Sequence, residues 1–310
     1  MRSRVRPFEN PRGSALHLLL AGIGIAITAC HPGNREAMSL RTSCEGGNVE
    51  ACNQLALRLQ KGEYILRDEA SAATLFGKAC TGGIGAGCAS LGLAYEKGAG
   101  IKRDSVRARG LFEQACASNG PEGCARLGIL YKRGAGVSKD IHRAAALFTR
   151  ACDAKSMSGC AQLATLQLTG EGVARDTVRA ADHFKKSCDA KVPAGCLGLG
   201  RMHEAGIVVA RNDSTAAALY REACTTGELD ACFERGRVWE FGIGVRPSFE
   251  NAASVYREAC EDKHGGACAR LAMLYERGAG VPRDPKQAAD LRKEACQYGY
   301  VDSCPPAKTS

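Results

Sequence analysis

Residues 116–140 read CASNGPEGCARLGILYKRGAGVSKD, and this stretch decides the fold. It holds two cysteines separated by seven residues, then a glycine at 134 and a carboxylate at 140. The same pattern recurs every 36 residues without slippage and places eight such cysteine pairs along the chain. A fixed period of this length predicts stacked supersecondary units, each of which contacts only its neighbours.

Each period contains the signals of two short helices. After the second cysteine, leucine, small and aromatic residues fall at i+3, i+4 and i+7, which is one face of a helix. Gly134 and its counterparts predict a left-handed cap at the end of this helix. Asp140 and its counterparts predict the N-cap of a second helix. The chain is therefore predicted to be all-α, a right-handed α/α superhelical solenoid of 36-residue helical hairpins.

The paired cysteines predict one disulfide in every hairpin. A cysteine that ends one helix can meet the cysteine that opens the next, and such a small loop contributes roughly 2 to 3 kcal/mol in the chain-entropy picture. Zinc is the alternative, but structural zinc sites usually use tighter spacings. We therefore predict no metal and no cofactor. The predicted pairs are Cys44 with Cys52, Cys80 with Cys88, Cys116 with Cys124, Cys152 with Cys160, Cys188 with Cys196, Cys224 with Cys232, Cys260 with Cys268, and Cys296 with Cys304.

The first 29 residues differ from the rest and predict a lipoprotein signal peptide. Four arginines precede the apolar run 15–29, which is too short for a membrane-spanning helix. The run ends in Ile27, Thr28, Ala29 and Cys30, a pattern that resembles the bacterial lipobox and predicts acylation of Cys30. A buried cysteine of an uncleaved anchor is the competing interpretation. His31 favours sorting to the outer membrane.

This organisation divides the chain into four parts. They are the signal peptide (1–29), a lipidated linker (30–35), the solenoid (36–304) and a C-terminal tail (305–310). The formal net charge of +9 forms no basic cluster, so we expect no nucleic-acid partner.

The quoted stretch resembles the Sel1-like repeat, a relative of the tetratricopeptide repeat, in the form found in helicobacter cysteine-rich proteins. The resemblance covers Cys44 to Cys304. It implies a secreted or periplasmic solenoid, in a family that includes adaptors and proteins described as penicillin-binding with slight β-lactamase activity. Tyr64 and Val208 depart from the pattern by replacing a loop glycine, and Arg235 departs from it by replacing a core leucine.

No motif in the sequence supports catalysis. No serine is followed three residues later by lysine, and no two histidines stand at metallo-hydrolase spacing. Hydrolysis by residues that converge in a groove stays open. We therefore predict a membrane-anchored scaffold whose concave face binds protein, peptide or peptidoglycan fragments. Penicillin binding with weak β-lactamase activity is the alternative.

The repeat that begins at Cys224 is the most aromatic and is the predicted contact patch. Tryptophan and arginine are favoured anchors in binding sites, so Arg235, Trp239 and Phe241 are candidate binding residues. His203 is a fourth candidate, because it occupies the repeat position that Tyr95, Tyr131 and Tyr275 hold in other repeats. Core filling is the competing interpretation for all four. In most repeats a basic residue directly precedes the N-cap of the second helix, and we call these residues the basic column. Together they could bind an acidic polymer as a ladder of charges, although a solvated loop face is the favoured interpretation. This column comprises Arg67, Arg103, Lys139, Arg175, Arg211 and Arg283.

Overall fold

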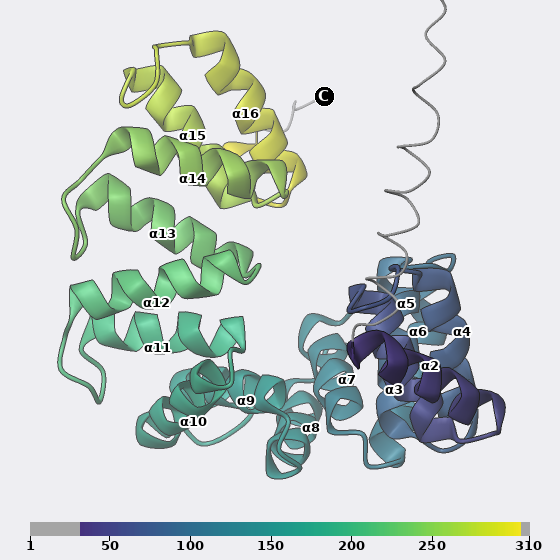
Figure 1. Cartoon of the computed structure of the whole chain (residues 1–310). Helices are drawn as coiled ribbons and strands as arrows, with labels where there is room; N and C mark the ends of the chain where they lie inside the picture. The colour runs from purple at the N-terminus through teal and green to yellow at the C-terminus, as the bar shows by residue number, and fades with distance from the viewer. Residues whose placement is uncertain (1–31, 305–310) are drawn as a thin grey trace, which may run out of the picture. The chain divides into compact units, whose positions relative to one another are not determined.

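The computed structural model describes residues 32–304. Fifteen α-helices and one short 3-10 helix make up this part of the chain, which contains no strand (Figure 1). Among these helices, none is both long and apolar enough to cross a bilayer. The all-α prediction is confirmed. The predicted signal peptide, Cys30 and the tail 305–310 lie outside the described residues.

The chain forms two compact units, residues 1–123 and 124–310. The described part of the first unit contains α2 (Pro32–Glu45), α3 (Val49–Lys61), α4 (Glu69–Thr81), α5 (Gly85–Lys97) and α6 (Ser105–Ala117). Helix α7 (Pro121–Arg133) begins at the end of the first unit and continues into the second. Since α2 begins at Pro32, the last residues of the predicted linker are helical.

The second unit continues the same alternation of helices (Figure 1). It contains α8 (Ile141–Asp153), α9 (Met157–Thr169), α10 (Thr177–Asp189), α11 (Pro193–Ala205), α12 (Asp213–Thr225), α13 (Leu229–Phe241), α14 (Phe249–Glu261), α15 (Gly265–Arg277), α16 (Pro285–Gln297) and η1 (Val301–Ser303). Short loops join neighbouring helices into hairpins, as the 36-residue period predicts.

Both predicted cap positions are present in all seven hairpins that begin with an odd-numbered helix. The glycine after the first helix has a φ between 66° and 78°, the left-handed conformation that costs other residues energy. These glycines are Gly62, Gly98, Gly134, Gly170, Gly206, Gly242 and Gly278. A polar side chain then accepts hydrogen bonds from the first turn of the second helix. These residues are Asp68, Asp104, Asp140, Asp176, Asn212, Ser248 and Asp284.

Most hairpins carry a second loop glycine, which also has the left-handed conformation. A Cβ on Gly100, which has a φ of 68°, would lie 2.2 Å from the carbonyl carbon of Glu69. Tyr64 and Val208 occupy the same loop position with φ of 60° and 66°. A left-handed conformation costs a non-glycine residue roughly 1 to 2 kcal/mol, so these two loops are strained.

In six of the seven hairpins the core is built on one aromatic ring, and the last hairpin has Arg292 at this position. The rings of Phe76, Phe112, Phe148, Phe184, Tyr220 and Tyr256 are at most 2% exposed. Each faces a small residue of the preceding helix. A Cβ on Gly92, for example, would lie 2.7 Å from Cε1 of Phe112. The small residues let the helices of a hairpin approach closely, as the sequence columns indicate.

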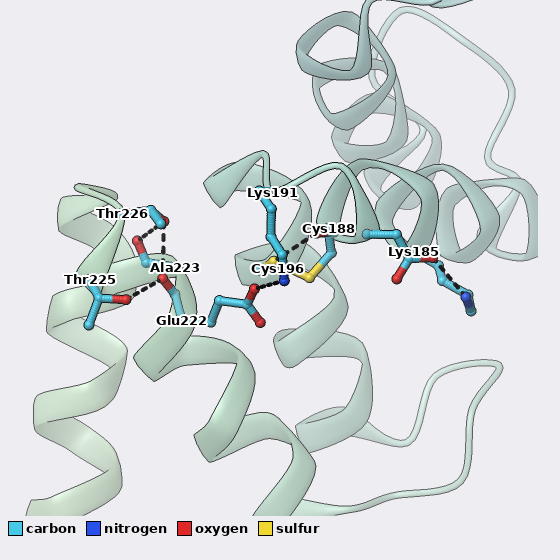
Figure 2. Close-up of a disulfide and its surroundings, with 9 residues drawn as sticks. Lys185, Cys188, Lys191, Cys196, Glu222, Ala223, Thr225 and Thr226 are labelled. Carbon is cyan, nitrogen blue, oxygen red and sulfur yellow. Dashed lines mark hydrogen bonds and ion pairs between the residues drawn. A yellow bond between two sulfur atoms is a disulfide. The ribbon is translucent and has the colours of Figure 1, made fainter. Parts of the chain in front are cut away.

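Disulfides connect each hairpin to the next. The bridges whose geometry is described join cysteines eight positions apart, with Cα–Cα distances of 4.5 to 4.8 Å. Cys116 and Cys124 are disulfide-bonded as well. Figure 2 shows the bridge between Cys188 and Cys196, which closes the turn from α10 to α11. The predicted disulfide in every repeat is confirmed.

Candidate functional site

Arg235 and Trp239 lie together, as residues four positions apart on one helix do. Both line a pocket of about 260 Å³ between α12 and α13. Arg235 occupies the position of a core leucine, and its Nη1 lies 4.0 Å from Sγ of Cys224. Trp239 is partly buried against the core cluster that Tyr256 belongs to. Core packing therefore accounts for one side of Trp239, while the pocket leaves another side accessible.

Phe241 and His203 do not line this pocket. Phe241 is 54% exposed, and the guanidinium of Arg270 lies 5.4 Å from the centre of its ring. In α11, the Nδ1 of His203 is buried and has no hydrogen-bond partner in the described part of the chain. The four predicted residues thus do not form a single site, and their role in binding stays a prediction.

A larger hollow of about 640 Å³ lies in the second unit, lined by three consecutive disulfide-closed turns. We call it the Phe233 hollow. Its lining comprises Arg133, Arg201, Gly227, Glu228, Leu229, Asp230, Phe233, Glu234, Lys263, His264, Gly265, Gly266, Tyr298, Gly299 and Tyr300. The turns precede α13, precede α15 and follow α16. Because a disulfide closes each turn, the wall is held in place before any ligand binds.

His264 fixes part of this wall. Its Nδ1 accepts a hydrogen bond of 3.0 Å from the backbone N–H of Ala267 and thereby caps α15. The imidazole stacks on Phe233, with ring centres 5.1 Å apart, and its Nε2 lies 3.2 Å from Oδ1 of Asp230. This hydrogen bond from His264 lowers the pKa of Asp230. The acceptor role of Nδ1 requires the proton to be on Nε2, so the ring is oriented by both of its nitrogens.

Several charges in the hollow are not neutralised by close partners. Arg133 and Lys263 form no ion pair with any residue between 32 and 304. Burial raises the pKa of Glu228, and repulsion from Asp230 adds to this shift. A hollow with free cations, a carboxyl group and aromatic rings can hold the carbonyl, charged and apolar groups of a peptide.

Behind the hollow, a ladder of arginines and glutamates connects α11 to α13. Arg201 donates two hydrogen bonds to Oε1 of Glu234, at 3.2 and 2.9 Å. Arg237 bridges Oε2 of Glu234, at 2.5 Å, and Oε1 of Glu204, at 3.2 Å. Glu234 is only 7% exposed, so its two arginine partners compensate for the burial of its charge. The ladder fixes the base of the hollow.

Two buried tyrosines extend this polar network. The hydroxyl of Tyr220 donates to Glu204 at 2.7 Å, and that of Tyr256 donates to Glu240 at 2.8 Å. Burial, and then the neighbouring glutamate, raises the pKa of each tyrosine well above its ordinary value. Both hydroxyls therefore stay protonated and act as donors.

Local partners hold several members of the predicted basic column. Arg211 forms two hydrogen bonds with Asp213, at 3.0 and 3.1 Å, and Arg67 pairs with Glu69. Arg175 and Arg283 donate to backbone carbonyls seven residues earlier. These contacts favour the interpretation of a solvated loop face over a ladder for an acidic polymer.

The sequence patterns missed the hollow because about half of its lining belongs to turns. Turn residues such as Lys263, His264 and Tyr300 fall outside the helical periodicity, so the repeated hydrophobic positions do not identify them. The available signal was variation between repeats, since the turn residues differ while the flanking cysteines do not. Phe233 of the hollow also belongs to the aromatic repeat that begins at Cys224.

The model of the Sel1 repeat matches the chain seven times, over residues 49–84, 85–120, 121–156, 158–192, 193–227, 229–264 and 266–299. No curated protein sequence matches the chain. Among solved structures, a Sel1 repeat protein from Oxalobacter formigenes is 24% identical, with a TM-score of 0.56 over 86% of this chain and 77% of that one.

A protective antigen present in uropathogenic Escherichia coli strains is 26% identical, with a TM-score of 0.52. This comparison covers 86% of the present chain but only 57% of the antigen. Helicobacter pylori cysteine rich protein B is 28% identical over 42% of this chain and 93% of its own length, with a TM-score of 0.34. Because the repeat matches run almost without interruption from residue 49 to residue 299, the chain belongs to the Sel1 repeat family, a scaffold fold that typically serves protein–protein interaction.

Proposed function

We propose that this protein is an extracytoplasmic scaffold that binds an extended peptide segment of a partner protein in the Phe233 hollow. One observation carries the proposal. Three consecutive disulfide-closed turns, the end of α7 and Arg201 of α11 line one hollow of about 640 Å³, a size typical of ligand sites. The family supports the coarser part of the proposal, since Sel1 repeats typically bind proteins.

The chemistry of the hollow fits a peptide better than a purely apolar or purely anionic ligand. Arg133 and Lys263 can donate to backbone carbonyls or to an acidic side chain. Tyr298 and Tyr300 offer rings that bury apolar area at little entropic cost. The backbone at Gly266 and Gly299 carries no side chain that would block an approaching strand. A bound segment would gain affinity because the disulfides have already ordered these turns.

Peptide selection followed by direct binding tests this proposal. We would select peptides from a random library against the oxidised chain and measure each by fluorescence anisotropy. Tyr300→Ala and Lys263→Ala are expected to weaken binding about tenfold or more each, because both change the wall of the hollow without touching its charged base. Val178→Ala serves as the matched control, since Val178 is 65% exposed in α10 and does not line the hollow.

The two predicted patches can be separated by the same assay. Trp239→Ala alters the pocket between α12 and α13 and leaves the Phe233 hollow intact. Peptides that lose affinity with Trp239→Ala but not with Tyr300→Ala would show that the binding site is that pocket. Peptides indifferent to both variants would contradict either location.

The membrane anchor is a second part of the proposal and rests on the lipobox-like residues around Cys30 alone. We expect the mature chain to begin at an acylated Cys30, which mass spectrometry of the N-terminus detects. Cys30→Ala should yield an unacylated chain released from the membrane fraction. An unmodified N-terminus in the wild type contradicts the anchor. Penicillin binding with weak β-lactamase activity stays a prediction from the resemblance, and nitrocefin turnover by the oxidised chain tests it.

A further inference from the structure

Two of the disulfides lie beside a glutamate of the following hairpin. Glu222 of α12 faces the bridge of Cys188 and Cys196, and Glu294 of α16 faces the bridge of Cys260 and Cys268. In each group the two sulfur atoms and one carboxylate oxygen lie within 4.8 Å of one another. Figure 2 shows Glu222 extending from α12 toward the disulfide.

This placement gives the oxidised protein no hydrogen bond. A disulfide has no proton to donate, yet Oε2 of Glu294 lies 3.6 Å from Sγ of Cys260. Glu294 forms no ion pair within residues 32–304, and its side chain is exposed enough to turn into solvent. A carboxylate held against a sulfur pair suggests a function for the reduced form of that pair.

One sulfur–oxygen separation is that of a zinc site. Zinc bonds of about 2.3 Å to sulfur and about 2.0 Å to oxygen place tetrahedral ligands about 3.5 Å apart for S and O and about 3.8 Å apart for two S atoms. The distance of 3.6 Å between Cys260 and Glu294 already has the first value. The S–S bond must open before the two sulfur atoms can reach the second value, about 3.8 Å.

We propose that reduction of the Cys260–Cys268 and Cys188–Cys196 disulfides creates two zinc sites, each with two thiolates and one glutamate as ligands. A dithiol reductant supplies two electrons and two protons to the S–S bond and leaves as its own disulfide. Zn²⁺ then displaces the two thiol protons into solvent. Water fills the fourth position. A small-molecule disulfide that accepts two electrons from the thiolates, and leaves as two thiols, re-forms the S–S bond and releases the metal. This proposal goes beyond the scaffold function.

The charges beside each cysteine pair predict which pair binds zinc most tightly. Glu294 has no competing cation, whereas Lys191 holds Glu222 in an ion pair of 2.6 Å, so the Cys260–Cys268 site should bind zinc more tightly. At Cys224 the guanidinium of Arg235 lies 4.0 Å from the sulfur and opposes a metal cation. In the sequence register of Glu222 and Glu294, the earlier hairpins carry Lys78, Gln114, Arg150 and Lys186. These residues offer no carboxylate.

Zinc protection of thiols tests the proposal on the full chain. The chain is reduced with dithiothreitol, freed of it by gel filtration without oxygen, incubated with Zn²⁺, and then alkylated and mapped by mass spectrometry. We expect Zn²⁺ to slow alkylation of Cys260 and Cys268 at least tenfold, and that of Cys188 and Cys196 less. Glu294→Gln should abolish protection of the first pair only. Glu258→Gln, at the same sequence register in α14, should change nothing.

Several results would overturn the proposal. Equal protection of all pairs, with or without loss of helical circular dichroism on reduction, would mean that the folded carboxylates play no part. Unchanged protection in Glu294→Gln would have the same meaning. Equal zinc affinity of the oxidised and reduced chains, measured by competition with a chromophoric chelator, would show that the thiols are not the ligands.

Discussion

Two hairpins of the second unit solve the same packing problem in different ways. The hairpin of α9 and α10 buries Phe184, and the residue sixteen positions earlier is Leu168. The hairpin of α13 and α14 buries Tyr256 in the same place, and the residue sixteen positions earlier is Glu240, which accepts its hydroxyl. The repeat therefore tolerates a buried hydroxyl only together with its acceptor, because an unpaired polar group in the core is costly.

The largest effect is expected from removing that acceptor. Glu240→Ala leaves the hydroxyl of Tyr256 without its partner and removes the carboxylate 3.6 Å from Arg270. We expect the free energy of unfolding to fall by about 3 kcal/mol. Glu276→Ala is the control, because Glu276 has the same register but forms a half-exposed ion pair with Arg292, worth less than about 1 kcal/mol. Urea unfolding measures both, and equal losses would break the comparison.

Adding a hydroxyl to the core of the α9–α10 hairpin should lower the free energy of unfolding by less than Glu240→Ala does. Phe184→Tyr buries a hydroxyl opposite Leu168, so we expect a loss of about 2 kcal/mol. Phe112→Tyr in the first unit has Glu96 sixteen positions earlier and should lose less than about 1 kcal/mol. The difference between the two variants in urea unfolding measures the value of the acceptor. A well-tolerated Phe184→Tyr would show that the hydroxyl finds another partner.

The tyrosine hairpins should also lose stability in alkali. Burial raises the pKa of Tyr220 and Tyr256, so the unfolded chain releases these protons first as pH rises. The stabilisation is complete below about pH 10 and is lost above it, by about 1.4 kcal/mol per pH unit for each tyrosine. Unfolding between pH 9 and 11 should therefore show a shallower decline in the double variant Tyr220→Phe, Tyr256→Phe. Parallel pH curves for the wild type and the double variant would contradict the raised pKa of the two tyrosines.

The smallest effect concerns the loop between α11 and α12, the hairpin between the two compared above. Val208 has a φ of 66° where Gly244 of the next hairpin has 68°. Val208→Gly should raise the free energy of unfolding by about 1 kcal/mol, because glycine relieves the strain but loses more chain entropy. Gly244→Val should do the opposite and more, since its Cβ would lie 2.3 Å from the carbonyl carbon of Asp213. Thermal melting checks both.

The sequence predicted the fold because its signals repeat in register. Seven occurrences of a glycine such as Gly98 and a cap such as Asp104 determine where helices end and begin. The constant cysteine spacing, together with the predicted helix ends, predicted the bridges. The tyrosine acceptors also have a sequence signal, since Glu204 and Glu240 precede Tyr220 and Tyr256 by the same number of residues.

The Phe233 hollow was not predicted from the sequence, for a physical reason, and none of the four predicted residues lines it. Arg235 and Trp239 share a face because they are four residues apart, but Phe241 lies two positions further round the helix. Which turns of successive hairpins meet depends on how each hairpin rotates against the next. That rotation follows from many side-chain contacts and has no local sequence signal. Only the structure therefore shows that His264 and Tyr300 line the same hollow.

The short span of every bridge also bears on how the chain matures. Cys44 can meet Cys52 after a closure of eight positions, whereas the next cysteine, Cys80, is 28 positions beyond Cys52. Loop-closure entropy favours the near partner over the far one by about 1 kcal/mol, before any helix forms. In an oxidising compartment, an emerging chain can therefore bridge each pair in order from the N-terminus, and few wrong partners need to be corrected.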